Sequence, residues 1–249
     1  MSAALLSQLG LWRQMPEVAI DMAHRATKLA QDSLFREADV IRAIRLQGAA
    51  ALGSGDSVKA DECLHYALTR ARTVNFVEEE IQALVALAEL RRRQGDGNAA
   101  REMLDDAWEL AERGPYPLFH ADAFNVLAQI ERDAGNAAAA VDAATQAYFL
   151  AWCDGPPFAY HWGLVAARQH LAALGAPEPV LPPFDESRYE PMPEVEIDPV
   201  DEFDAGTGVE EDRRASNTWR NFAKWMSSTW TRWRKGRLGL SRHGRWTIF

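Results

Sequence analysis

A turn followed by a helix-like pattern recurs with a period of about forty residues, and this repeat constrains the fold more than any other feature. Gly55-Asp56, Gly95-Asp96 and Gly135-Asn136 lie forty residues apart, and Gly175 follows at the same interval. After the three turns come the quartets Ala60/Leu64/Ala67/Ala71, Ala100/Leu104/Ala107/Ala111 and Ala140/Ala144/Ala147/Ala151. Such periodicity is typical of stacked repeats, in which no unit buries its apolar face alone. We therefore predict an all-α array of helical hairpins.

Each unit reads as helix, tight turn, helix, because Gly suits the end of the first helix and Asp or Asn can cap the second. We expect a repeat domain over 1–176, with units over about 1–32, 36–73, 77–113 and 118–152 and a last helix over 157–175. In the first unit the quartet Ala19/Ala23/Ala26/Ala30 follows a shortened helix. An array that begins within a unit leaves an apolar face uncovered. We expect that face to be a degenerate cap, or to contact a partner or a preceding part of a longer chain.

The repeat positions resemble the tetratricopeptide repeat (TPR) family, in a variety with about forty residues per unit. With units counted from residues 41, 81 and 121, the matching positions hold Gly48, Ala88 and Ala128; Gly55, Gly95 and Gly135; Ala60, Ala100 and Ala140; Leu64, Leu104 and Ala144; and Ala67, Ala107 and Ala147. The pattern departs from the family at Ile44, Leu84 and Phe124, where a Trp is common. The resemblance covers about residues 3–175 and implies a right-handed superhelix of hairpins.

The same resemblance implies a concave groove lined by the first helix of each unit. The residues that it places there are Arg42, Arg45, Gln82, Glu89, Arg92, Asn125, Gln129, Arg132 and Trp162. Guanidinium and amide groups in this arrangement can hold an extended or helical peptide through charge-assisted and amide hydrogen bonds. The alternative for each residue is an ordinary solvated helix face.

The string from Ala151 to Trp162, ahead of a helix that ends near Leu174-Gly175, is similar to the C-terminal repeat region of bacterial NTPases of the STAND/NACHT type. In those proteins the repeats hold or release an upstream nucleotide-binding module. This sequence contains no Gly-x-x-x-x-Gly-Lys-Ser/Thr loop, so any such module would belong to another part of a longer chain.

Charge divides the remaining sequence into two contrasting segments. Residues 185–212 hold twelve acidic residues and one basic residue, whereas residues 213–249 hold ten basic and no acidic residues. We predict a disordered, Pro-rich acidic linker over 177–215, with Phe184 and Tyr189 lying back on the last helix, and a basic tail over 216–249. A helix over about 217–235 would carry an aromatic stripe opposite basic residues, and its surface would include Trp219, Phe222, Trp225, Trp230 and Trp233.

The tail admits several interpretations. A cationic, Trp-rich helix suits the interface of an anionic membrane, and it could equally dock on acidic surface of the same chain. Nucleic acid is the least favoured of the active partners, although basic residues interleaved with aromatic ones suit it. The remaining alternative is a terminus without function.

No residue pattern points to catalysis, a metal or a cofactor. The six histidines are scattered, and Cys153 with His161 lacks an evident third group to complete a nucleophilic site. Only Cys63 and Cys153 are present, and no apolar run reaches the length of a membrane span, so we expect a cytoplasmic protein. The sequence thus predicts a non-enzymatic module that binds a protein or peptide, as an interaction or sensing element of a STAND-type system. The alternative is a peripheral membrane adaptor anchored by the tail.

Overall fold

The computed structural model describes residues 3–30, 36–114, 116–188, 239–240 and 246–247. The chain divides into two compact units, Met1–Glu186 and Ser187–Phe249. In the described part of the first unit, all regular secondary structure is helical. The α-helices are α1 (Ala3–Trp12), α2 (Pro16–Ala30), α3 (Arg36–Ser54), α4 (Ser57–Val74), α5 (Val77–Arg93), α6 (Gly97–Ala111), α7 (Pro117–Asp133), α8 (Ala137–Trp152) and α9 (His161–Ala173).

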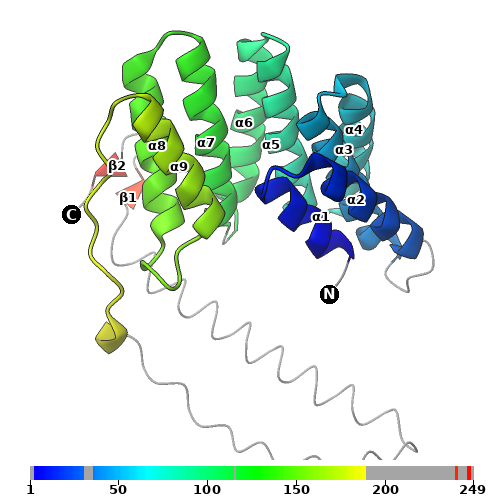
Figure 1. Cartoon of the computed structure of the whole chain (residues 1–249), viewed down its shortest axis with the longest axis horizontal. Coiled ribbons are helices and arrows are strands. Elements are labelled where there is room, and N and C mark those ends of the chain that lie inside the picture. Colours follow the sequence, from blue (N-terminus) through cyan, green and yellow to red (C-terminus); the bar gives the residue numbers. More distant parts are fainter. Residues whose placement is uncertain (1–2, 31–35, 115, 189–238, 241–245, 248–249) are drawn as a thin grey trace, which may run out of the picture. The chain divides into compact units, whose positions relative to one another are not determined.

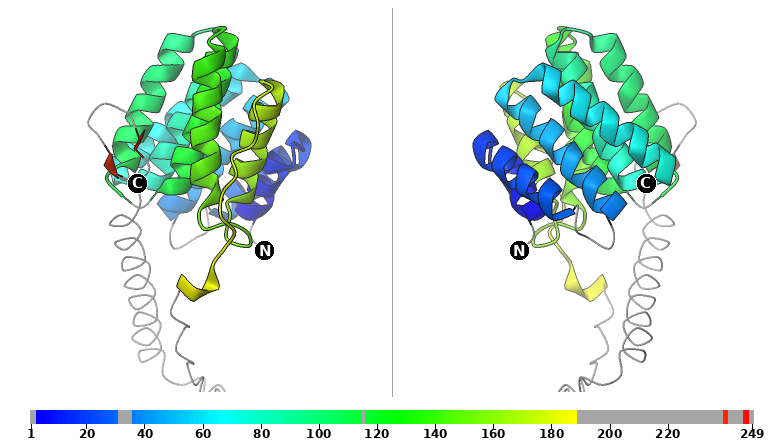
Figure 2. Two further views of the ribbon diagram at one scale, coloured as in Figure 1. Left: turned by 90° about the vertical axis from the view of Figure 1, so that its left-hand side faces the viewer. Right: turned by 90° about the vertical axis from the view of Figure 1, so that its right-hand side faces the viewer.

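The helices form hairpins that follow one another from α1–α2 to α7–α8, with α9 after the last of them (Figure 1), and Figure 2 shows the same array from two sides. Each helix packs against the next along the chain, and each odd-numbered helix also contacts the next odd-numbered one. This arrangement confirms the prediction of an all-α array of packed hairpins for the described residues of this unit. The odd-numbered helices therefore form one layer of the array.

The turn residues adopt the backbone conformation that the repeat predicted. Gly55, Gly95, Gly135 and Gly175 have φ values of 87°, 83°, 77° and 67°, a region in which a Cβ is strained. Gln14 takes the same place in the first hairpin, with φ of 54°. Each of these residues lets the chain leave one helix and reverse direction within a few residues.

The polar residue after the turn caps the next helix in only two of the three hairpins with a Gly-Asp or Gly-Asn turn. Asp56 Oδ1 accepts from the Lys59 amide at 3.1 Å, and Asp96 Oδ1 accepts from the Ala99 amide at 3.0 Å. Asn136 makes no such bond, because its amide Nδ2 donates instead to Glu131 at 2.8 Å. The third turn therefore tethers its Asn to the preceding helix.

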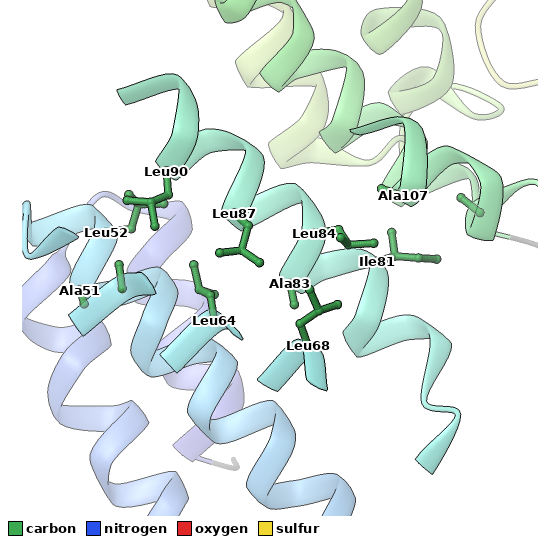
Figure 3. Close-up of a cluster of buried hydrophobic side chains, with 12 residues drawn as sticks. Ala51, Leu52, Leu64, Leu68, Ile81, Ala83, Leu84, Leu87, Leu90 and Ala107 are labelled. Carbon is green, nitrogen blue, oxygen red and sulfur yellow. The ribbon is translucent and has the colours of Figure 1, made fainter. Parts of the chain in front are cut away.

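All three quartets that follow the turns are buried in the core. Between α3, α4, α5 and α6 the apolar side chains form one continuous cluster, shown in Figure 3. Its members include Leu52, Leu64, Leu68, Ile81, Leu84, Leu87 and Leu90. Burial of several leucines at about 1.5–3 kcal/mol each supplies much of the stabilisation of such an array. The repeat quartets thus mark where consecutive hairpins meet.

The region after α8 differs from the sequence prediction. We expected the last helix to start at Pro157, but α9 begins at His161, because Gly155–Tyr160 form a loop closed by a bond from the Tyr160 amide to the Ala151 carbonyl at 2.7 Å. The helix ends at Ala173, and Gly175 follows in the conformation expected of a helix stop.

Residues 176–184 lie along α8 and α9, where we had predicted a solvated linker from residue 177 onward. The Trp152 indole Nε1 donates to the Pro182 carbonyl at 3.1 Å. The Phe184 ring packs on Phe158 in the loop before α9, with centroids 4.8 Å apart, where we had predicted contact with the last helix; Tyr189 is outside the described residues. The segment that follows α9 therefore covers this end of the array.

In the second unit the described residues form two short strands, β1 (Gly239–Leu240) and β2 (Trp246–Thr247), which pair antiparallel. The sequence did not predict this hairpin in the tail. The predicted helix over 217–235 lies outside the described residues, and so do its surface residues Trp219, Phe222, Trp225, Trp230 and Trp233. Their roles stay predictions.

Candidate interaction face

The candidate site is the odd-helix face, which we define by the residues that the sequence predicted on the first helices. They are Arg42 and Arg45 on α3, Gln82, Glu89 and Arg92 on α5, Asn125, Gln129 and Arg132 on α7, and Trp162 on α9. The structure places all nine on the odd-numbered helices. It also shows that several of them are occupied by contacts within the array.

A buried carboxylate joins α3 to α5. Glu79, only 1% exposed, accepts from Arg42 Nε at 2.8 Å and from Arg45 Nε at 2.5 Å. The Arg45 guanidinium is buried with it, because two hydrogen-bonded charges neutralise each other where water is excluded. Arg42 instead keeps 40% of its side chain exposed and lies over the Phe76 ring, 5.6 Å from its centroid. Arg45 is thus an internal residue, whereas Arg42 is held in place and still faces solvent.

A second ionic network joins α5 to α7. Glu89 accepts two hydrogen bonds from Arg92, at 2.7 and 2.8 Å, and one from Arg93 at 2.6 Å. Arg92 also pairs with Asp133 at the end of α7. Burial alone would raise the pKa of Glu89, but hydrogen bonds and charge from the two guanidinium groups outweigh it and lower the pKa. Glu89 and Arg92 are therefore engaged with each other inside the array.

The polar residues of α7 divide between internal and accessible positions. Asn125 is buried, and its Nδ2 donates to the Gly163 carbonyl of α9 at 3.1 Å, so it fixes the last helix. Gln129 is half-buried, and no side-chain hydrogen bond of it is recorded among the described residues. Arg132 is 42% exposed, with Asp133 no closer than 3.8 Å. Burial, followed by the positive charge of Arg132, lowers the pKa of His170 on α9. Gln129 and Arg132 thus remain available to a ligand.

Trp162 does not line an open groove, because it stacks on Trp12 at the end of α1. The ring centroids lie 5.6 Å apart and the planes are inclined by 18°. The His161 ring adds an edge contact to Trp162 at 4.8 Å. The first and last helices of the array therefore meet on this face.

A polar pair lies next to the stack. The Tyr160 hydroxyl donates to Asp122 Oδ2 at 3.2 Å, which ties the loop before α9 to α7. Burial raises the pKa of Asp122 to about 7, although the Tyr160 hydrogen bond opposes the shift. Burial, and then the neighbouring Asp122 carboxylate, raise the pKa of Tyr160, while hydrogen bonding with the Trp12 side chain acts in the opposite direction. Trp12, Trp162, Tyr160 and Asp122 form one cluster, which we call the end cluster.

Sequence reasoning missed the partners of these residues. Glu79 lies between two other acidic residues in the first turn of α5, a pattern typical of a helix start, and it follows Arg42 by 37 residues and Arg45 by 34. Stacked first helices bring those positions together, so the repeat register carried the signal. The end cluster had no comparable signal, because Trp12 lies in a shortened unit and outside the repeat pattern.

The structure also bears on the thiol, the metal site and the membrane span that the sequence analysis considered. Burial raises the pKa of the Cys153 thiol, which donates to the Leu150 carbonyl at 3.4 Å, an environment that favours the protonated form. Among the described residues, no group of three or more His, Cys, Asp or Glu side chains is arranged to hold a metal ion. No helix in the described ranges is long and apolar enough to cross a membrane.

No family model and no curated protein matches the chain. The fold and the face define a helical-hairpin array with a charged layer of first helices. The resemblances to TPR proteins and to the repeats of STAND-type NTPases stay predictions.

Proposed function

We propose that the array is a non-catalytic interaction module that binds an acidic peptide segment on the odd-helix face. The observation that carries the proposal is the position of Arg42. Its Nε is bonded to Glu79 and its plane lies over Phe76, so the guanidinium is fixed while its exposed edge faces solvent. A charged donor that is already ordered loses little side-chain entropy when it binds a carboxylate.

Other accessible groups extend this site along the layer. Gln82 on α5, Gln129 and Arg132 on α7 continue from Arg42 across successive odd-numbered helices. Amide groups can bond the backbone of an extended segment, and two guanidinium groups favour acidic side chains. Because the end cluster joins α1 to α9, a bound segment would lie beside the Trp12–Trp162 stack or displace it. The wider part of the proposal is that the module serves a STAND-type signalling system.

Fluorescence anisotropy with a labelled peptide tests this function. The probe is a fluorescein-labelled peptide of alternating Glu and Ala, and its counterpart carries Lys in place of Glu. We expect the Glu peptide to bind and the Lys peptide not to bind. The double variant Arg42→Gln/Arg132→Gln should weaken binding about tenfold or more, because each charged hydrogen bond is worth about 1.5–3 kcal/mol.

Arg113→Gln is the matched control, since Arg113 follows α6 and is 67% exposed outside the odd-helix layer. It removes one positive charge, as each substitution of the double variant does, and should leave the affinity unchanged. Equal binding of both peptides, or equal losses in the control and the double variant, would rule out the site. The pair Arg45 and Arg92, which the sequence alone would suggest for mutation, is unsuitable because both residues hold the array together.

A further inference from the structure

The face of α1 and α2 that points away from α3 carries exposed apolar side chains, and those on α1 occupy positions that are buried in later units. Leu5 on α1 is 61% exposed, whereas Leu46, one repeat later, is 1% exposed. Leu9 is partly exposed, and its repeat equivalents Ala50, Leu90 and Ile130 are buried. On α2, Val18 and Leu29 are also exposed. The inner units cover the two α1 positions with the preceding hairpin, whereas the α2 positions correspond to the partly exposed Lys59 and Arg70.

The opposite end of the array is already covered by the chain itself. Residues 176–184 lie along α8 and α9, where Glu178 accepts from Arg168 at 2.9 Å and Leu181 packs into the adjoining core. A head-to-tail assembly needs two different open ends. With one end covered, identical copies can associate through the α1–α2 face only by a two-fold axis that brings the same face together.

The charges on this face suit such an axis. Helix α1 contains no charged residue in Ala3–Trp12. On the exposed side of α2, Glu17 and Asp21 occupy the first half and Arg25 and Lys28 the second, and no ion pair of theirs is recorded among the described residues. An antiparallel second α2 therefore brings acidic residues against basic ones.

The centres of the pairs also fall within one residue of one another. With the axis at the level of Ala23, Asp21 lies opposite Arg25 of the second copy, and Glu17 lies within one residue of a position opposite its Lys28. The same axis brings Val18 next to Leu29 of the second copy, so apolar side chains flank the ion pairs. Charge, polarity and spacing thus agree on one register.

We propose that the α1–α2 face binds a second copy of this chain, with α2 antiparallel to α2 across a two-fold axis. A helix of this length spans about 22 Å, and two helices side by side are about 20 Å wide. The footprint of about 450 Å² per copy is about half that of a standard stable interface, so the dimer should be weak, with Kd in the micromolar range or above. The nine residues of the odd-helix face lie on α3, α5, α7 and α9, outside this contact.

Sedimentation velocity of the full chain at increasing concentration, up to about 500 µM, tests the proposal. We expect a reversible shift from monomer to dimer with no larger species. Asp21→Arg and Arg25→Glu, each alone, should weaken the dimer about tenfold, because each places like charges opposite one another twice. The double variant Asp21→Arg/Arg25→Glu should restore it, and so should a mixture of the two single variants.

Leu29→Asp should also weaken the dimer, and Val58→Asp on α4 is its matched control at another exposed apolar position. Circular dichroism of every variant checks that the helices remain folded. A monomer at all concentrations overturns the proposal. So does a dimer that ignores the charge exchanges or responds equally to Val58→Asp, since it would use another surface.

Discussion

Trp12 and Trp162 stack face to face although 150 residues separate them, with ring centroids 5.6 Å apart. The stack joins the end of α1 to the start of α9, so it links the two ends of an array whose more extensive helix–helix contacts connect near neighbours in the described residues. A solenoid held only by neighbour contacts can lose its end units one at a time. The stack couples both end units.

Trp12→Ala should therefore loosen the far end of the array as well as its own helix. We expect a loss of about 1–2 kcal/mol in the free energy of unfolding, since an aromatic pair contributes about 0.5–1.5 kcal/mol beyond its buried area. Hydrogen exchange should speed up at the first amides of α9. Trp12→Phe keeps a stacking ring and should show a smaller effect. Unchanged exchange in α9 would mean that the stack does not couple the ends.

The Asp122–Tyr160 pair predicts an unusual pH dependence. The folded-state pKa of Asp122 is about 7, above its unfolded value of about 3.9. Between these values the folded state binds more protons than the unfolded state, so the free energy of unfolding falls as pH rises. The carboxyl contributes its full stability below about pH 4 and loses it by about pH 7. The decrease is at most about 4 kcal/mol, from about three pKa units at 1.36 kcal/mol each.

Asp122→Asn removes this titration and keeps an acceptor for Tyr160. Urea unfolding at several pH values should show the variant gaining stability relative to wild type as pH rises from about 4 to 7, and a constant difference above that. Taking the difference cancels the other titrating groups, such as Glu89, whose pKa is lowered. A difference that does not change with pH would contradict the raised pKa.

Glu79 is the second position at which a single charge should matter. Glu79→Gln leaves the buried Arg45 guanidinium without a counter-charge, and breaking a buried pair in this way costs about 3–5 kcal/mol. The control is Glu78→Gln, an exposed residue next to it on α5, which should change the free energy of unfolding by less than about 0.5 kcal/mol. Chemical denaturation measures both, and similar values would mean that Glu79 is not an essential partner.

The repeat predicted the parts of the fold that depend on spacing. Positive φ at Gly55 and Gly95 and the burial of Ala60 and Ala100 follow from small residues at fixed intervals, because only they fit a tight turn and a close helix contact. The start of α9 was predicted four residues too early, because a proline suits the first turn of a helix and also suits the loop that is present.

The candidate face was harder to predict than the fold. The sequence placed Arg42 and Arg45 on one layer, but their different exposure depends on Glu79 in the next unit, which is a tertiary effect. The contact between Trp12 and Trp162 depends on how the small rotations between hairpins add up along the array. No local sequence pattern predicts the total rotation along the array.

Gly48 marks a close approach between α3 and α4 and leads to a final prediction. A Cβ built on Gly48 would lie 2.7 Å from Leu64 Cγ and 3.1 Å from Cys63 Cβ on α4. Gly48→Ala should therefore push α3 and α4 apart, at a cost of about 1–3 kcal/mol that exceeds the roughly 0.5–1 kcal/mol gained from better helix propensity. Gly53→Ala, on the same helix, meets only Pro16 Cβ at 3.8 Å and should be neutral or stabilising. Thermal unfolding of both variants separates the two effects: a lower Tm for the first and an equal or higher Tm for the second are expected. If both substitutions raised Tm, the α3–α4 contact would have room for a methyl group, and the small residue at this repeat position would reflect helix geometry rather than packing.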